Sequence, residues 1–204
     1  MEDEALEIEV KFHAADPGAL RARLAALGAE LLGSVFEVNV LYDDALDSLS
    51  QRGGLLRLRR DGACRLTAKL PPENADRRFK VMREWEVTVS DASAMENILA
   101  ALGFCPRRRY EKERETWLLG GAHVTVDRLG FGFFVEIEGR AAEIPRVAAL
   151  LGFSWERRII RNYLEIFAAI KKGEGWSAQD PTFALLDGLS VDIEKYLPLL
   201  EQGH

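Results

Sequence analysis

The sequence Glu7-Ile8-Glu9-Val10-Lys11 alternates charged and apolar residues. Period-two alternation is typical of a strand, and it places both glutamates and the lysine on one face. The Glu-x-Glu pattern recurs at 84–86 and 136–138, and each copy precedes an amphipathic segment that ends in Leu-Gly, at 27–28, 102–103 and 151–152. Three such pairs predict one sheet that gathers carboxylates in one place, where a cation would relieve their repulsion.

The bulk composition is that of a soluble globular protein. The 204 residues are 48% hydrophobic and 29% charged, which allows one large domain or one domain with an appendage. No apolar run approaches the roughly 20 residues of a membrane span, so we expect no membrane partner. The net charge of −6 argues against a nucleic-acid partner, but the 27 Lys and Arg residues leave room for a basic pocket.

The cysteines and the N-terminus predict a cytoplasmic protein. Cys64 and Cys105 are too few for a disulfide scaffold and lack the spacing of metal ligands. The first four residues, Met1 to Glu4, are acidic, whereas a secretion signal begins with basic residues.

Turn residues divide the chain into eight predicted strands, at 5–13, 35–43, 55–60, 64–70, 80–89, 109–118, 122–128 and 132–139. Asp16-Pro17 predicts the start of a helix that Gly28 ends. Further helices are predicted at 92–102, 143–151 and 161–171, and a helical stretch is predicted at 190–201. Mostly hairpin-linked strands indicate an antiparallel sheet, and eight are enough to close a barrel.

Charged residues are sorted onto one face of these strands. Acids and bases share this face, often as same-sign neighbours two residues apart, while amphipathic helices are available to cover the apolar faces. Two arrangements remain open: a barrel whose charged face lines a wet tunnel, or an open sheet whose charged face meets solvent. Dry burial of so many unpaired charges would cost several kcal/mol per ion, so a tunnel requires bound ions.

Several motifs occur in order, each on a predicted strand: Glu7-Ile8-Glu9-Val10-Lys11, Leu56-Arg57-Leu58-Arg59, Leu66-Thr67-Ala68-Lys69, Glu84-Trp85-Glu86, Lys112-Glu113-Arg114, Asp127 and Phe134-Val135-Glu136-Ile137-Glu138. At these residues the chain, from 5 to about 165, resembles the CYTH superfamily of triphosphate tunnel metalloenzymes. That superfamily includes class IV adenylyl cyclases, thiamine triphosphatases and inorganic tripolyphosphatases. The resemblance implies an α+β fold in which an eight-stranded antiparallel barrel has a charged interior and helices packed outside. Beyond the resemblance we expect an extra C-terminal helical tail.

The resemblance also implies site residues. The bases would bind a small-molecule triphosphate: Lys11, Arg57, Arg59, Lys69, Lys112 and Arg114. The acids would hold Mg²⁺ or Mn²⁺, hard ions that prefer oxygen ligands: Glu7, Glu9, Glu84, Glu86, Asp127, Glu136 and Glu138. We expect Glu7, Glu9, Glu136 and Glu138 nearest the metal, with the others orienting water or pairing with bases.

The expected chemistry is metal-dependent hydrolysis of a triphosphate, with Glu9 or Glu138 accepting a proton and Lys11 stabilising developing charge. Inorganic tripolyphosphate, thiamine triphosphate and nucleoside triphosphates all fit. Two alternatives stay open: a class IV-type cyclase that makes cyclic AMP and pyrophosphate from ATP, and a non-catalytic binder of polyphosphate or nucleotide.

Two features fall outside the resemblance. In Asn39-Val40-Leu41-Tyr42-Asp43, Leu41 replaces an aromatic or polar position of the motif, which leaves the contribution of this strand to substrate choice open. We assign residues 1–172 to the tunnel domain and 173–204 to a helical tail, which would be a lid, a homodimer contact or a packing appendage. We interpret Tyr163 as a core tyrosine.

Overall fold

The computed structural model describes residues 6–201. The acidic N-terminal residues, the first residue of the first predicted strand and the last three residues of the tail lie outside this range. No helix within it is long and apolar enough to cross a membrane. The strands are β1 (Leu6–His13), β2 (Glu30–Asp43), β3 (Leu55–Arg60), β4 (Cys64–Leu70), β5 (Lys80–Thr88), β6 (Cys105–Leu119), β7 (Ala122–Leu129) and β8 (Gly132–Glu138).

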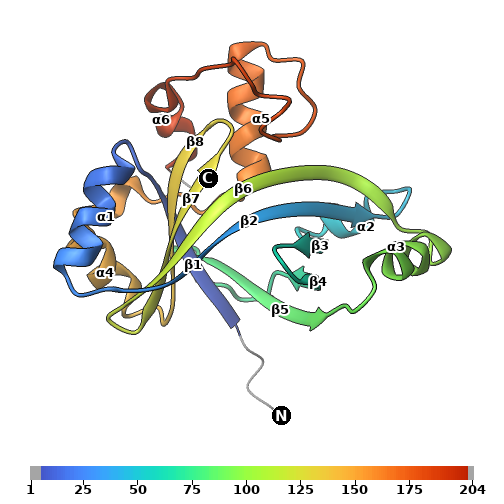
Figure 1. The fold of residues 1–204 in the computed structure, drawn as a ribbon, viewed down its shortest axis with the longest axis horizontal. Helices are drawn as coiled ribbons and strands as arrows, with labels where there is room; N and C mark the ends of the chain where they lie inside the picture. The colour runs from blue at the N-terminus through green and yellow to red at the C-terminus, as the bar shows by residue number, and fades with distance from the viewer. Residues whose placement is uncertain (1–5, 202–204) are drawn as a thin grey trace.

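The eight strands form a closed antiparallel barrel in the order β1-β5-β4-β3-β2-β6-β7-β8 (Figure 1). The hairpins β3–β4, β6–β7 and β7–β8 pair neighbours in the chain. The ring closes where β1 pairs with β8 on one side and with β5 on the other. The eight-stranded antiparallel barrel predicted from the sequence is confirmed.

Three helices begin where the sequence provides N-caps. The Asp16 carboxylate accepts from the Ala19 N–H before α1 (Pro17–Ala26), and Asp91 caps α3 (Ala92–Ala101) in the same way. Asn162 and Glu165 form a capping box at the start of α5 (Tyr163–Glu174). The other helices are α2 (Ser48–Gln51), α4 (Ile144–Leu151) and α6 (Leu197–Leu200).

The main hydrophobic core lies outside the barrel wall. Leu24 of α1 and Val147 of α4 are fully buried with Val10, Val124 and Ile137, which point outward from β1, β7 and β8. Figure 1 shows α1 and α4 together on one side of the barrel and α3 on the opposite side. Because the apolar faces are covered from outside, the charged faces must line the interior, which selects the first of the two arrangements.

A second core joins α5 and the tail to the barrel. Ile166 and Ile170 of α5 are fully buried together with Phe134 of β8, and Leu197 and Leu200 of α6 belong to the same cluster. Figure 1 shows α5 and α6 over one end of the molecule, away from α1 and α3. The tail therefore packs against the barrel.

The largest differences from the predicted elements are in β2 and β6, in α2 and in the tail. The strands β2 and β6 begin earlier than predicted, because they pair continuously from Glu30–Leu118 to Asp43–Cys105 with two irregularities. The one-turn helix α2 was not predicted. The helical stretch predicted at 190–201 is only a 3₁₀ turn at Ile193–Lys195 and the short α6, because Pro198 cannot donate a backbone N–H to a longer helix.

The external core predicts a large effect of truncating α1. Leu24→Ala should lower the free energy of unfolding by about 2–5 kcal/mol, because it removes a fully buried side chain and leaves a cavity. Leu27→Ala, at a residue 37% exposed near the end of the same helix, is the control and should cost less than about 1 kcal/mol. Urea unfolding of both variants measures the difference, and equal losses would contradict the assignment of this core.

Candidate functional site

A cavity of about 1610 Å³ extends from the barrel interior to α5, and its walls carry nearly all of the predicted site residues. Strand alternation turns Lys11, Arg57, Lys69 and Lys112 inward, and each is at most 8% exposed. Long basic side chains are almost never buried to this extent unless they are paired. The cavity lining includes the other two predicted bases and six of the predicted acids: Arg59, Arg114, Glu7, Glu9, Glu84, Glu86, Glu136 and Glu138.

Strand register places opposite charges directly across from each other. Lys11 faces Glu136 on β8, and Lys69 faces Glu84 on β5. The Lys11 Nζ lies 3.1 Å from Glu136 Oε1, and the Lys69 Nζ lies 2.8 Å from Glu84 Oε2. These cross-strand ion pairs compensate buried charges that would otherwise be costly.

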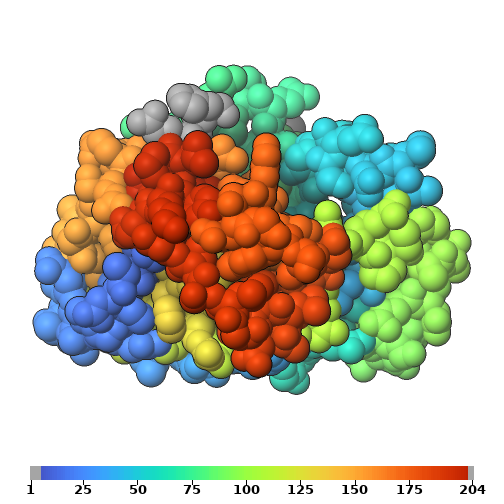
Figure 2. All heavy atoms as spheres, turned by 90° about the horizontal axis from the view of Figure 1, so that it is seen from above, coloured from blue at the N-terminus to red at the C-terminus, as the bar shows by residue number. Residues whose placement is uncertain are grey.

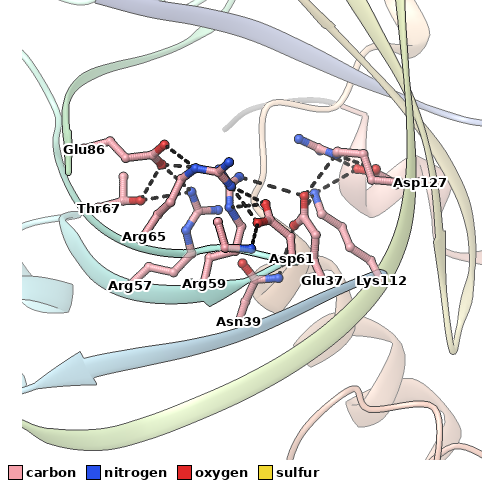
Figure 3. Close-up of polar contacts among 12 residues, drawn as sticks. Glu37, Asn39, Arg57, Arg59, Asp61, Arg65, Thr67, Glu86, Lys112 and Asp127 are labelled. Carbon is pink, nitrogen blue, oxygen red and sulfur yellow. Dashed lines mark hydrogen bonds and ion pairs between the residues drawn. The ribbon is translucent and has the colours of Figure 1, made fainter. Parts of the chain in front are cut away.

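Asp127, the remaining predicted acid, is the centre of a buried network on β6 and β7 (Figure 3). Its carboxylate lies 2.6 Å from Nη2 of Arg114 and 3.1 Å from Nζ of Lys112, and it accepts from the Tyr163 hydroxyl at 2.6 Å. The Lys11 and Lys112 ammonium groups each lie 5.2 Å from the centroid of the Tyr163 ring. Tyr163 is therefore in the core, as predicted, and also supports the bases of the site.

Arginines from β3 and β4 share carboxylates on the opposite part of the wall (Figure 3). Glu86 lies 3.4 Å from Arg59 and 3.6 Å from Arg65, and it accepts from the Thr67 hydroxyl at 2.8 Å. Asp61, at the β3–β4 turn, pairs with both of these arginines. In the structure Glu84, Glu86 and Asp127 thus pair with bases.

Glu7, Glu9, Glu136 and Glu138, which we call the acidic cluster, lie on β1 and β8. Glu9 faces Glu138 directly across the closing strand pair. Glu9 accepts from Lys11 at 2.6 Å and from Lys80 at 2.7 Å, whereas Glu138 has no ion-pair partner among residues 6–201. A like-charged cross-strand pair is unfavourable, so this part of the wall favours an added cation.

The pKa values of the acidic cluster reflect this asymmetry. Burial opposes ionisation of Glu9, but Lys11 and Lys80 outweigh it and lower its pKa to about 2. The pKa of Glu136 is likewise well below its usual range, because Arg114 and Lys11 outweigh the effect of burial. Burial raises the pKa of Glu138 to about 7, and the charges of Glu7, Glu9 and Glu136 act in the same direction.

The family of the chain follows from the comparisons with known proteins. The model of the CYTH domain matches residues 5–151, which contain all eight strands and all of these charged residues. The chain belongs to the CYTH domain family. No curated protein matches the sequence.

Solved structures support the CYTH fold. A protein from Vibrio parahaemolyticus, named a "putative adenylate cyclase", is 23% identical, with a TM-score of 0.71 over 82% of this chain and 100% of its own. The PH1819 protein from Pyrococcus horikoshii OT3 is 26% identical, with a TM-score of 0.67 over 79% and 98%. A third structure is that of a Hippeastrum protein, described as a putative adenylyl cyclase with a dominant triphosphatase activity. It is 21% identical, with a TM-score of 0.52 over 72% of this chain and 84% of its own.

Sequence reasoning missed Asp61 and two further charged residues of the CYTH interior, Glu37 and Lys80. Glu37 is 1% exposed and lies 3.6 Å from Lys112; burial opposes its ionisation, but Lys112, Arg114 and Arg59 lower its pKa to about 2. Lys80 donates to Glu9. Strand parity was the available signal, because Glu37 shares a face with Leu41 on β2 and Lys80 shares a face with Glu84 on β5.

The chemistry of the acidic cluster fits a hard divalent cation. Its carboxylates repel one another, and the Glu138 carboxylate has no ion-pair partner among residues 6–201. Among the described residues, no three Asp, Glu, His or Cys groups already converge as a complete metal site. Mg²⁺ commonly uses one or two carboxylates and takes its other ligands from water and substrate phosphates. The residues therefore suit a cation that binds together with a phosphate-bearing ligand.

The raised pKa of Glu138 predicts a pH-dependent effect of its replacement. The folded protein keeps the Glu138 proton up to about pH 7, whereas an ordinary glutamate loses it near 4.5, so this contribution to stability is lost as pH rises through 7. In EDTA at pH 8, Glu138→Gln should raise the free energy of unfolding by about 1–2 kcal/mol, and near pH 4.5 by much less.

Urea unfolding across this pH range is the measurement. Glu113→Gln is the control, because Glu113 is an exposed β6 carboxylate paired with Arg128. The control should show no comparable gain at pH 8. A difference between Glu138→Gln and wild type that stays constant with pH would contradict the expectation.

Proposed function

We propose that this CYTH protein catalyses the metal-dependent hydrolysis of a triphosphate-containing substrate bound inside the barrel. The observation that supports this most strongly is the set of buried bases that face one cavity from four strands, β1, β3, β4 and β6. A triphosphate carries about four negative charges, and several fixed cations around it match that charge. In the structure, carboxylates pair with these bases. The ion pairs hold the bases in position before a substrate binds.

Arg57 has the features of a phosphate-binding residue. It is 8% exposed, and its Nε donor has no hydrogen-bond acceptor among the described residues. Its Nη2 donates to the Thr67 hydroxyl at a long 3.4 Å and lies 3.9 Å from Glu86. Buried donors without acceptors are rare in proteins, and an anionic oxygen in the cavity would satisfy this one.

Carboxylates of the acidic cluster would hold Mg²⁺ or Mn²⁺. When bound, such an ion supplies charge neutralisation at phosphate oxygens and makes water a stronger acid. Glu138 is better placed than Glu9 to accept a proton, because both Lys11 and Lys80 already bind Glu9. Lys11, held between Glu9 and Glu136, would stabilise charge that develops on the leaving phosphate.

The fold does not select hydrolysis over cyclisation. The Hippeastrum protein carries the names of both activities, which belong to that protein. Hydrolysis demands less of the site, because it needs an oriented water rather than a positioned ribose hydroxyl. The cyclase and the non-catalytic binder are therefore alternative outcomes of the test.

The test is ³¹P NMR of the purified protein with Mg²⁺ or Mn²⁺, given tripolyphosphate and ATP in separate tubes. A hydrolase should release orthophosphate in at least one tube, and EDTA should abolish the release. Formation of cyclic AMP and pyrophosphate from ATP would replace the proposal by the cyclase alternative. If there is no turnover in either tube, thiamine triphosphate is added in a third, and its survival would overturn the proposal.

Arg57 and Arg60, on the same strand, provide a matched pair of variants. Arg57 faces the cavity, whereas Arg60 is on the outer face, 52% exposed at its side chain, and pairs with Glu96. Arg57→Ala should raise KM for the triphosphate by about tenfold or more, because a buried charge-assisted contact is lost. Arg60→Ala should change KM less than twofold.

Thermal unfolding of both arginine variants separates binding from folding. A folded Arg57→Ala protein with unchanged KM would remove Arg57 from the binding site.

A further inference from the structure

The cavity continues beyond the charged interior to a less polar end formed by α5 and the segment after it. Leu164, Phe167, Ala168 and Trp176 line this end, which we call the outer pocket together with Leu41 of β2. Figure 2 shows the C-terminal segments, in orange and red, spread over this face of the molecule. Apart from Leu41, these residues lie beyond the CYTH match, which ends at residue 151.

Helix periodicity explains why α5 presents apolar side chains to the cavity. Leu164 and Ala168 are four residues apart and so lie on one face, which continues to Lys171. Ile166 and Ile170, on another face, are fully buried in the second core and fix the orientation of the helix. The α5 helix therefore forms one wall of the outer pocket, with Lys171 and Lys172 near its end.

A glycine turn brings Trp176 back over α5. Gly175 has φ of +68° and ends the helix in the left-handed conformation, after which the Trp176 N–H donates to the Lys171 carbonyl at 3.0 Å. The indole ring is 6.3 Å from the Phe167 ring, centroid to centroid, and Trp176 is only half-buried. A large aromatic surface is thus held at the cavity wall and still has area available for contact.

Leu41 connects the outer pocket to the phosphate-binding bases. In the β2–β3 register Leu41 lies directly opposite Arg57, and both line the cavity. Leu41 also packs against the second core, to which α5 belongs. The apolar Leu41 and the cationic Arg57 are therefore on neighbouring strands, so one ligand can contact both.

We propose that the outer pocket binds an aromatic ring attached to the triphosphate, so that the substrate is an organic triphosphate ester rather than inorganic tripolyphosphate. This inference rests on the proposed function, because it assumes that the interior bases hold the phosphates. The ring stacks on Trp176 and contacts Leu41 and Leu164, as apolar and aromatic walls do in ligand sites generally. Lys171 and Lys172 add positive charge at this end of the cavity.

Binding of two matched probes tests the proposal without relying on turnover. Calorimetry in Mg²⁺ compares adenylyl imidodiphosphate, which has a ring, with diimidotriphosphate, which has none. The wild-type protein should bind the ring-bearing probe at least tenfold more tightly. Trp176→Ala should remove most of this preference and leave the affinity for diimidotriphosphate within twofold, while Trp176→Phe should retain most of it.

Trp85→Ala is the matched control. Trp85 is on β5 between two inward-facing glutamates, is 47% exposed and lies on the outer face of the barrel. Its replacement should change neither affinity. Unchanged diimidotriphosphate binding in Trp176→Ala also shows that the barrel has folded, so a change confined to the ring-bearing probe is not due to unfolding.

The outcomes distinguish failure of this inference from failure of the proposed function. Equal wild-type affinity for the two probes, or a preference that survives Trp176→Ala, would overturn the ring pocket even if ³¹P NMR shows hydrolysis. A preference lost in Trp176→Ala would support the pocket even if no hydrolysis occurs. Displacement of adenylyl imidodiphosphate by thiamine triphosphate or by ATP, whichever acts at lower concentration, identifies the ring that fits better.

Discussion

The interior of this barrel depends on neutralising charges that have been taken out of water. Each buried base needs a carboxylate within reach, because an unpaired ion in such a place costs several kcal/mol. Strand register meets this need by placing Lys11 opposite Glu136, Lys69 opposite Glu84, and Arg114 opposite Asp127. A one-residue slip of any strand would turn its charges outward into the external core, so the same pairs help to fix the register.

Under the proposed function, ligand binding to such an interior would be an exchange of partners. A triphosphate that reaches Lys11 or Lys69 competes with Glu9, Glu136, Glu7 and Glu84, which hold these lysines now. A carboxylate released from a lysine becomes available to a cation. Binding of triphosphate and binding of metal should therefore favour each other, and by linkage the effect is reciprocal.

Period-two alternation was enough to predict the eight strands and which of their residues share a face, because both follow from local sequence. Which face lines the interior depends on where the helices pack. It did not predict which charges pair, since pairing depends on register between strands far apart in the chain. Asp127 entered the predicted metal set through the resemblance and its strand parity, yet it holds Lys112, Arg114 and Tyr163. Glu37 was missed because its strand has no repeated charge pattern. The role of the tail was left open because its contacts are tertiary.

Closure of the ring between β1 and β8 also has a consequence for how the chain is made. Leu6–His13 leaves the ribosome early, but one of its two edges has no partner until Gly132–Glu138 has been synthesised. At about 5–20 residues per second, that interval lasts on the order of ten seconds. During this time Glu7, Glu9 and Lys11 make the nascent edge polar, which discourages pairing with other chains until its own last strand arrives.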